Sequence, residues 1–452
     1  MNETKALARI VYGLDDGALT PERTKDIRYK LLDWLGCAAG SVSRPAAAGL
    51  LRSVKEEENR GSGTVLGAAG TYPLLTAAFL NGAISHILEC DDVHKSAITH
   101  PGVVAITSAL AAVEYTGGTF RDFALAVIAG YEVMIRLGNA LNPSHYDYWH
   151  TTGTCGAFAA AAAAGKVFGL DPGELENAFG FAATMASGLT CVFGTDAKLI
   201  NVGNAVRNGI QAALLSRAGL GSCPDVLERD HGYAFAVSAR PDLGAVTEAR
   251  DGWMIDTAYY KLYASCAHTH SALDAFFLLQ KARGFSPESI REIRVRAYSK
   301  AAELIGSLKT DSAAQAKFSL PYCLAAAAVR GMVSVRQFEP EALNDPEIRD
   351  LARRITVQAE SGYDLEYPRK RIETVTVYLK DGQVLEKTVE LPEGRPGTDF
   401  LEKKFRLLST LTMDGEASDR LRDQVLALAP DCSLREQIKR WKECMQYVKL
   451  DD

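Results

Sequence analysis

Residues 76–101, TAAFLNGAISHILECDDVHKSAITHP, carry the two signals that decide our interpretation of the fold. The first half is a run of small and apolar residues, which is typical of a helix packed closely against its neighbours. The second half gathers three acids, two histidines and a lysine, and such groups are buried only together with partners. We therefore predict a helical core whose polar residues converge on one pocket.

Outward from this stretch, residues 73–220 are dominated by Ala, Gly and Leu, as in GAFAAAAAAGKVFGL. Alanine has the highest helix propensity and small side chains let helices approach closely, so we predict a dense helical bundle. Its apolar runs are about 10–15 residues long, which suits core helices better than membrane spans. In LDPGELENAFG, Asp171, Pro172 and Glu174 are spaced as at a capped helix start.

The pattern changes beyond about Tyr260. The segments SIREIRVRAYS, RRITVQAE and ETVTVYLKDGQVLEKTVELPEG are rich in β-branched residues and predict strands, with Asp381 and Gly382 as a two-residue hairpin turn. Helical patterns return at TDFLEKKFRLLSTL. We predict a mainly α protein, with a large all-helical domain of residues 1–261, completed by 397–452, and a smaller inserted α+β lid domain of residues 262–396.

Composition excludes several classes of protein. The 452 residues can bury a substantial core, and 50 Lys and Arg against 56 Asp and Glu offer no broad positive surface for nucleic acid. The N-terminal sequence lacks an uninterrupted apolar signal segment, and no later segment has the pattern of a membrane span, so we expect a soluble, cytoplasmic protein. Nine cysteines without a C-x-x-C pair favour reduced core thiols over a disulfide or metal framework.

Five of the eight histidines lie between His86 and His150. His94 and His100, with the acids Asp91 and Asp92, suggest a metal site, but no H-E-x-x-H motif or other short ligand spacing is present. We therefore predict no metal. A satisfied core histidine beside a helix-opening proline explains His100 equally well on the sequence alone.

Two later segments add cations. In FGTDAKLINVGNAVRNG, Lys198 stands among glycines and asparagines that can donate to an anion, and Arg207 adds a second cation on a helix. The spacing is not that of a P-loop, and an exposed loop lysine is the alternative for Lys198. YYKLYASCAHTH brings Lys261 and His270 to the domain junction, a favoured place for ligand pockets.

The same junction segment contains Cys266, and a catalytic Cys–His pair is one alternative there. We favour an arrangement in which Lys261 and one histidine face the junction while Cys266 packs, because the neighbouring residues are typical of a core. Further on, Tyr322 follows a proline at a helix start, and we expect its hydroxyl to reach outward.

Together these segments resemble the MmgE/PrpD family. The matching pieces are NGAISHILECDDVHKSAITHPG, YWHTTGTCGAFAAAAAAGKVFGLD, FGTDAKLINVGNAVRNG, KLYASCAHTH and AKFSLPYCLAAAAVRG, which occur in the family's order between about residues 30 and 340. The resemblance implies a helical domain with a smaller α+β lid, an active site between them, a homodimer, and no metal or organic cofactor.

The resemblance also implies pocket residues, carried over by position: Glu89, Asp91, His100, His150, Lys198, Lys261 and Tyr322. We add Arg207, His270 and Val93 as candidate substrate contacts. Family members commonly have Asp at the position of Glu89 and often Thr at that of Val93. We therefore expect these two positions to decide which acid is the substrate.

Chemistry shared by the family creates or quenches a carbanion next to a carboxylate. Lysines and a protonated histidine can hold carboxylates and stabilise an enolate, while a histidine or carboxylate moves the proton. We expect a cofactor-independent dehydratase of a hydroxylated di- or tricarboxylate that resembles 2-methylcitrate. His100 and His150 are the proton-transfer candidates, and Lys198 and Lys261 the carboxylate clamps.

Glu89 or Asp91 is expected to orient these groups or to act as a base. Two other reactions stay open, namely epimerisation or decarboxylation of a related acid that resembles iminodisuccinate or cis-aconitate. A noncatalytic protein that binds a small anionic metabolite is the alternative from outside the enzymes. A metal hydrolase is the third functional alternative.

Overall fold

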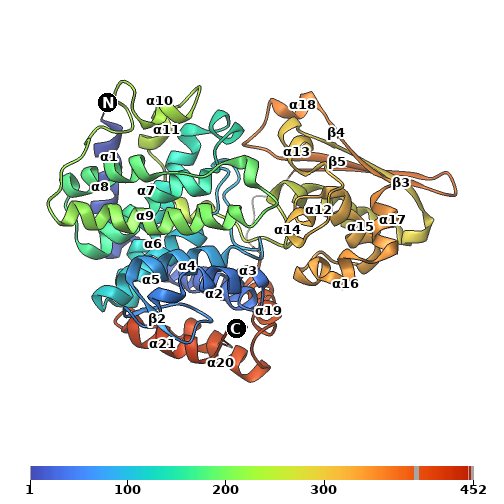
Figure 1. Cartoon of the computed structure of the whole chain (residues 1–452). Coiled ribbons are helices and arrows are strands. Elements are labelled where there is room, and N and C mark those ends of the chain that lie inside the picture. The colour runs from blue at the N-terminus through green and yellow to red at the C-terminus, as the bar shows by residue number, and fades with distance from the viewer. Residues whose placement is uncertain (1, 391–395, 446, 449–452) are drawn as a thin grey trace.

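The computed structural model describes residues 2–390, 396–445 and 447–448, which form two lobes (Figure 1). The larger lobe is helical and contains the first part of the chain together with the C-terminal helices. The smaller lobe combines helices with a four-stranded sheet. The prediction of a mainly α protein with a smaller α+β portion is therefore confirmed, while the domain limits at 261 and 396 stay predictions.

We call the larger part the helical lobe. Its helices are α1 (Glu3–Tyr12), α2 (Pro21–Ser41), α3 (Pro45–Arg52), α4 (Leu74–Ser85), α5 (Pro101–Thr116), α6 (Phe120–Leu141), α7 (Thr151–Phe168), α8 (Pro172–Met185), α9 (Ala197–Arg217), α10 (Tyr233–Val237), α11 (Gly244–Thr247), α19 (Thr398–Ser409), α20 (Gly415–Leu426) and α21 (Leu434–Glu443). A two-stranded ribbon, β1 (Gly63–Thr64) with β2 (Thr71–Tyr72), lies beside α4.

Helix α7 is the centre of this lobe, because it packs against α5, α6, α8 and α9. Its alanine run, residues 159–164, is fully buried, as expected for small side chains that allow close helix approach. Helix α6 is long and apolar enough to cross a membrane, yet 94% of its most apolar window is buried inside the lobe. That burial is typical of a core helix. The capping box predicted at Asp171 and Glu174 is present at the start of α8.

The mixed lobe contains the remaining elements. They are α12 (His270–Arg283), β3 (Ile290–Ala297), α13 (Ser299–Ile305), α14 (Ala313–Ala316), α15 (Leu320–Arg330), α16 (Pro340–Leu343), α17 (Pro346–Ala352), β4 (Ile355–Ala359), α18 (Ser361–Asp364), β5 (Ile372–Leu379) and β6 (Val384–Glu390). The sheet order is β4-β3-β5-β6, with β3 and β4 parallel and the other pairs antiparallel.

Helix α12 packs on β5 and β6, and α15 packs on β4, so the buried side chains of the sheet and these helices form the core of the mixed lobe. The predicted hairpin between β5 and β6 is confirmed, and Gly382 there has a φ of +91°, a conformation that favours glycine. The predicted strand ended in LPEG, and these residues lie outside the described part of the chain.

The C-terminal helix α19 is joined to α2 by a buried ion pair. Lys404 Nζ lies 2.7 Å from Asp33 Oδ1, and both side chains are almost completely buried. Because α2 and α19 are far apart in sequence, this pair fixes the end of the chain on its beginning.

Substituting Lys404→Met should leave the Asp33 carboxylate buried without a counter-charge. Breaking a buried pair on one side costs about 3–5 kcal/mol, so we expect a loss of that size in the free energy of unfolding, measured by urea denaturation. The matched control is Lys403→Met at the exposed neighbour, where we expect a change below about 0.5 kcal/mol. Equal losses for the two variants would contradict a stabilising role of the pair.

Candidate active site

Residues 86–100 connect α4 to α5 without helix or sheet structure, and we call them the site loop. All but two of them are buried. Glu89 and Ile98 have φ values of +55° and +51°, a left-handed conformation that is costly for residues with a Cβ and persists only where the surrounding fold imposes it. A buried loop of this kind must find partners for its carbonyl groups outside regular structure.

Four buried cations from distant segments supply these partners, and we call them the loop cations. Each donates to one backbone carbonyl oxygen of the site loop: Lys317 to Ile87 (2.8 Å), Lys261 to Glu89 (2.9 Å), Lys404 to Cys90 (2.7 Å) and Arg371 to Lys95 (2.8 Å). Two of them come from the mixed lobe, one from α19 and one from the segment between the lobes. The conformation of the loop therefore depends on both lobes.

The Glu89 carboxylate lies between two lysines. Lys198 Nζ is 2.5 Å from Glu89 Oε2, and Lys261 Nζ is 3.1 Å from Oε1. Burial alone raises the pKa of the Glu89 carboxyl, but the two ammonium groups outweigh it and hold this pKa well below its usual range. Glu89 is therefore ionised at neutral pH. Lys198 lies in the first turn of α9 and is buried, so it is not the exposed loop lysine of the alternative explanation.

Lys261 has no donor left for a ligand. Its ammonium group donates to Glu89 O, to Glu89 Oε1 and to Ser265 O, all within 3.1 Å. An ammonium has three N–H groups, and here each has an oxygen partner. The geometry makes Lys261 a positioning residue for Glu89, which differs from the carboxylate clamp that we expected from the sequence.

Asp91 holds two histidines. Its Oδ2 lies 3.0 Å from Nδ1 of His86 and 3.0 Å from Nδ1 of His100. Burial raises the pKa of the Asp91 carboxyl, but the two imidazoles outweigh it and keep this pKa well below its usual value. The contact with His86 has hydrogen-bond geometry, whereas His100 Nδ1 lies at ion-pair distance without an aligned hydrogen bond. A carboxylate 3.0 Å from Nδ1 still favours the proton on that nitrogen electrostatically, so Nε2 of His100 carries the lone pair.

His100 is neutral at physiological pH. Burial lowers its pKa to about 4, although Asp91 acts in the opposite direction. His86 is buried beside it, and its Nε2 accepts from Lys198 Nζ at 2.7 Å. A neutral, oriented imidazole with a free Nε2 lone pair is the form needed for a general base.

His150 approaches from the other side, at the N-terminus of α7. Its Nδ1 accepts a hydrogen bond from Asn201 Nδ2 at 3.2 Å, so Nε2 carries the ring proton. Burial first, and then Lys198, hold the pKa of His150 well below 6.5. His150 is therefore a neutral donor, whereas His100 is a neutral acceptor.

These groups surround a small cavity between the lobes. It is lined by Glu89, Val93, Ile98, His100, Tyr146, His150, Thr152, Lys198, Cys266, Ala267, His268, Phe318 and Arg371. Its free volume of about 20 Å³ has room for one water molecule. A ligand with more than a few heavy atoms therefore enters only if the walls move apart.

The structure brings together five predicted residues as cavity lining: Glu89, Val93, His100, His150 and Lys198. Asp91, Lys261 and His270 are buried and are not part of this lining, although Lys261 and Asp91 contact lining residues directly.

Two expectations, for Tyr322 and Arg207, are corrected by the geometry, and the alternative of a catalytic Cys266 thiolate is disfavoured. The Tyr322 hydroxyl is buried and donates to Gln337 O at 2.6 Å, because its helix start faces the core of the mixed lobe. Arg207 is exposed and lies over the Phe79 ring, away from the cavity. Cys266 lines the cavity, but burial raises the pKa of its thiol, so it is not a thiolate nucleophile at neutral pH.

Several lining residues were missed by sequence reasoning. Thr152 stands in the quoted stretch YWHTTGTCGAFAAAAAAGKVFGLD and Tyr146 lies two residues before it, so their closeness to His150 in the sequence was a usable signal. Arg371 stands in PRKRIETV, where a basic run beside a strand is typical of an exposed surface. Only the fold reveals that Arg371 is 2% exposed.

His86, Glu89 and His100 form a possible metal-ligating group, with one ligand atom from each within 4.8 Å of the others. The Lys198 ammonium already lies 2.7 Å from His86 Nε2 and 2.5 Å from Glu89 Oε2. A divalent cation at the same place would be repelled by Lys198 and Lys261. The donor set therefore fits an ammonium group better than a metal ion.

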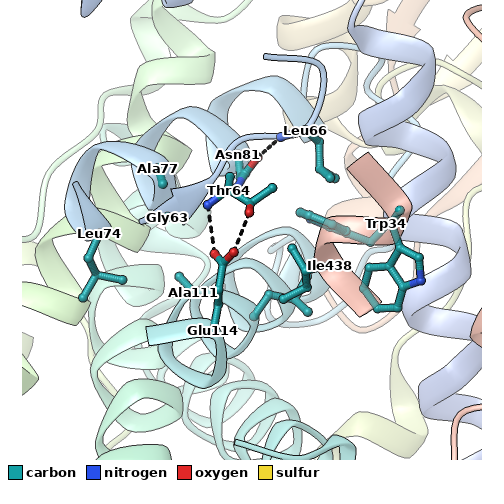
Figure 2. Close-up of a pocket in the computed structure, with 12 residues that line it drawn as sticks. Trp34, Gly63, Thr64, Leu66, Leu74, Ala77, Asn81, Ala111, Glu114 and Ile438 are labelled. Atoms are coloured by element: carbon teal, nitrogen blue, oxygen red, sulfur yellow. Dashed lines mark hydrogen bonds between the residues drawn. The ribbon is translucent and has the colours of Figure 1, made fainter. Parts of the chain in front are cut away.

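A second cavity lies between α4, α5 and α21 in the helical lobe (Figure 2). Its lining is mostly apolar, with Trp34, Ile438 and Trp441 among the larger side chains, and it includes no lysine or arginine. Its one acid, Glu114, accepts hydrogen bonds from the backbone and hydroxyl of Thr64. This cavity is a packing gap beside a satisfied carboxylate and does not suit an anionic ligand.

Known proteins are similar to this chain in sequence over nearly its whole length. Residues 5–245 match the MmgE/PrpD N-terminal domain, and residues 263–429 match the MmgE/PrpD C-terminal domain. Cis-aconitate decarboxylase of Aspergillus terreus is 28% identical, with 89% of this chain and 88% of that protein covered. The cis-aconitate decarboxylase-like protein oryM of Aspergillus oryzae is 26% identical over 96% of both chains, and human cis-aconitate decarboxylase is 26% identical over 95% and 93%.

Neutral buried histidines predict a loss of stability in mild acid. Burial lowers the pKa of His94 to about 3 and that of His100 to about 4. The unfolded chain protonates its histidines near pH 6.5, so the unfolded state binds more protons as the pH falls from there towards 4. We expect the free energy of unfolding to fall in this window, by up to about 1.4 kcal/mol per pH unit for each such histidine.

Urea denaturation at pH 7.5, 6.5 and 5.5 measures this slope. His100→Gln should make the slope shallower, whereas His231→Gln, at an exposed histidine, should leave it as in the wild type. A free energy of unfolding that does not change between pH 7.5 and 5.5 would contradict the neutral state of the buried imidazoles.

Proposed function

The chain belongs to the MmgE/PrpD family, and on that premise we propose that it is a cofactor-independent lyase that dehydrates a hydroxylated di- or tricarboxylate. The observation that carries this proposal is the pairing of His100 with Asp91. Asp91 holds Nδ1 of the ring at 3.0 Å, and the ring is neutral and borders the cavity. This is the state in which an imidazole removes a proton from carbon.

In the proposed reaction, His100 Nε2 takes the proton from the carbon next to a substrate carboxylate. The electron pair of the broken C–H bond moves towards that carboxylate and forms an enolate. The resulting imidazolium is stabilised by Asp91, which is ionised and within hydrogen-bond distance.

Lys198 is suited to stabilise the enolate. Two of its three N–H groups point to His86 Nε2 and Glu89 Oε2, and the third is left for a ligand in the cavity that Lys198 lines. An ammonium held in place before the reaction stabilises developing negative charge without reorganisation. Glu89 fixes the position of the Lys198 ammonium, and Lys261 fixes the position of Glu89.

Loss of water completes the reaction. The C–O bond breaks, its electron pair leaves with the hydroxyl group, and the enolate electrons form the carbon–carbon double bond. His100 returns the proton that it had taken, which converts the leaving group to water. His150 can donate its Nε2 hydrogen bond to the departing oxygen. The residues then return to their initial protonation states.

Decarboxylation of an unsaturated tricarboxylate is the second candidate, because the three curated relatives described above carry that activity in their names. In this reaction the bond to a carboxylate breaks, carbon dioxide leaves, and the carbanion takes a proton from the enzyme. Lys198 or His150 would have to supply that proton, because His100 is neutral in the free protein. Dehydration uses His100 in the protonation state in which it is found, and we therefore keep dehydration as the first candidate.

Homodimerisation and a cytoplasmic location belong to this proposal through the family resemblance. Substrate choice is proposed to depend on Glu89 and Val93, which border the cavity and differ from the common family residues.

The reaction is tested by incubating the purified protein with 2-methylcitrate, citrate and cis-aconitate in H2O and in D2O, followed by proton NMR and detection of carbon dioxide. Dehydration gives an unsaturated acid without carbon dioxide. Release of one carbon dioxide per acid consumed would replace it with decarboxylation. Deuterium at the α carbon without loss of water or carbon dioxide would indicate epimerisation, and binding without turnover would indicate a noncatalytic protein.

For the acid that is turned over, His100→Gln should lower kcat by about 10²–10⁴-fold, the usual contribution of general acid–base catalysis. His231→Gln is the matched control at an exposed histidine and should keep the wild-type kcat. The kcat/KM of the wild type should fall on the acid side as the pH approaches about 4, where His100 takes up a proton. Full activity of the His100→Gln variant would remove His100 as the base.

A further inference from the structure

Arg371 is a buried cation for which the described part of the chain supplies no ionised partner. It is 2% exposed, precedes β5 and lines the cavity from the side of the mixed lobe. One terminal nitrogen donates to Lys95 O at 2.8 Å, while the buried Nε has no hydrogen-bond partner. Among the described residues, no carboxylate lies within ion-pair distance of this guanidinium.

The groups around Arg371 do not neutralise it. They are the phenols of Tyr146, Tyr259, Tyr298 and Tyr367, whose pKa values are all raised, above all by burial, so these side chains are uncharged at neutral pH. The nearby Glu373 accepts from the backbone of Ala272 at 2.7 Å, and burial raises its pKa to about 8, so it is mostly protonated.

An unpaired buried cation is costly, and proteins retain one where a ligand supplies the opposite charge. The two cations on the other side of the cavity, Lys198 and Lys261, are already paired with Glu89. Arg371 is therefore the lining cation that has no carboxylate partner among the described residues. Its planar guanidinium matches a carboxylate in geometry, with several N–H groups in one plane.

We propose that Arg371 binds a second carboxylate of the substrate, remote from the carbon at which His100 acts, and thereby restricts the site to acids with at least two carboxylates. The proposal rests on the proposed function, since it takes His100 and Lys198 as the place of the reacting carboxylate. Tyr146 and His268 line the same cavity and flank this second subsite. Because Arg371 also donates to Lys95 O of the site loop, the position of this subsite depends on both lobes.

Three unreactive acids of similar size test the proposal by isothermal titration calorimetry: tricarballylate, glutarate and butyrate, with three, two and one carboxylates. We expect the wild type to bind tricarballylate and glutarate at least tenfold more tightly than butyrate. Arg371→Gln should weaken binding of the first two acids by about 10–100-fold, the size of one lost charge-assisted hydrogen-bonded contact. Binding of butyrate should change by less than about threefold.

The matched control is Arg369→Gln, an exposed arginine two residues earlier, which should bind all three acids as the wild type does. Arg371→Lys keeps the charge but loses the planar fork, and we expect a loss of about 5–20-fold for the polycarboxylates. This variant carries the test if circular dichroism shows that Arg371→Gln does not fold.

Wild-type affinity for tricarballylate in the Arg371 variants would overturn the proposal, and so would an equal loss for butyrate, which would indicate a purely structural role. Failure of the wild type to prefer acids with two or three carboxylates would overturn it as well. Selective, Arg371-dependent binding without turnover of any acid would refute the proposed reaction and leave the subsite standing. Turnover of an acid whose binding does not depend on Arg371 would refute the subsite and leave the proposed reaction standing.

Discussion

Hydrogen bonds from the four loop cations to the carbonyl oxygens of the site loop are the interaction on which the rest of the structure depends. A carbonyl left unpaired in the interior costs about 1–3 kcal/mol, and this loop has neither a helix nor a sheet ladder to satisfy it. Long cationic side chains can reach such a carbonyl from another segment, and their donors remain charged there. Lys261 stabilises the left-handed backbone conformation of Glu89 in this way, because its ammonium group donates both to the Glu89 carbonyl oxygen and to the Glu89 carboxylate.

The same interactions determine the charge balance of the cavity. Within the helical lobe and the connecting segment, Lys404 is paired with Asp33, and Lys261 with Glu89. The loop cations of the mixed lobe, Lys317 and Arg371, have no such carboxylate partner among the described residues. The loop cations outside the mixed lobe therefore have carboxylate partners, and the mixed lobe adds positive charge without such a partner, which attracts an anionic ligand. Burial lowers the pKa of Lys317 to about 8, so part of this excess is lost in mild alkali.

Local signals in the sequence were sufficient for much of the fold. The cap at Asp171 and Glu174 and the turn at Gly382 involve residues only a few positions apart, and both are present. The site was predictable where residues were unusual for their surroundings, as with His100 in an apolar region. It was not predictable where the partner lies far away in the chain. Arg371 looked like part of an exposed basic run, and nothing local indicated that all three donors of Lys261 would be occupied.

The dependence of the site loop on α19 has a consequence for synthesis of the protein on the ribosome. Chains grow from the N-terminus, so α1–α4 and the site loop, which ends at residue 100, emerge about 300 residues before Lys404. During this time Asp33 of α2 lacks its counter-charge and the Cys90 carbonyl lacks its donor. The face of α2 that packs against α19 therefore stays uncovered in the nascent helical lobe until the mixed lobe and then α19 have been synthesised. Maturation of the site is thus a late event, timed by the order of the chain.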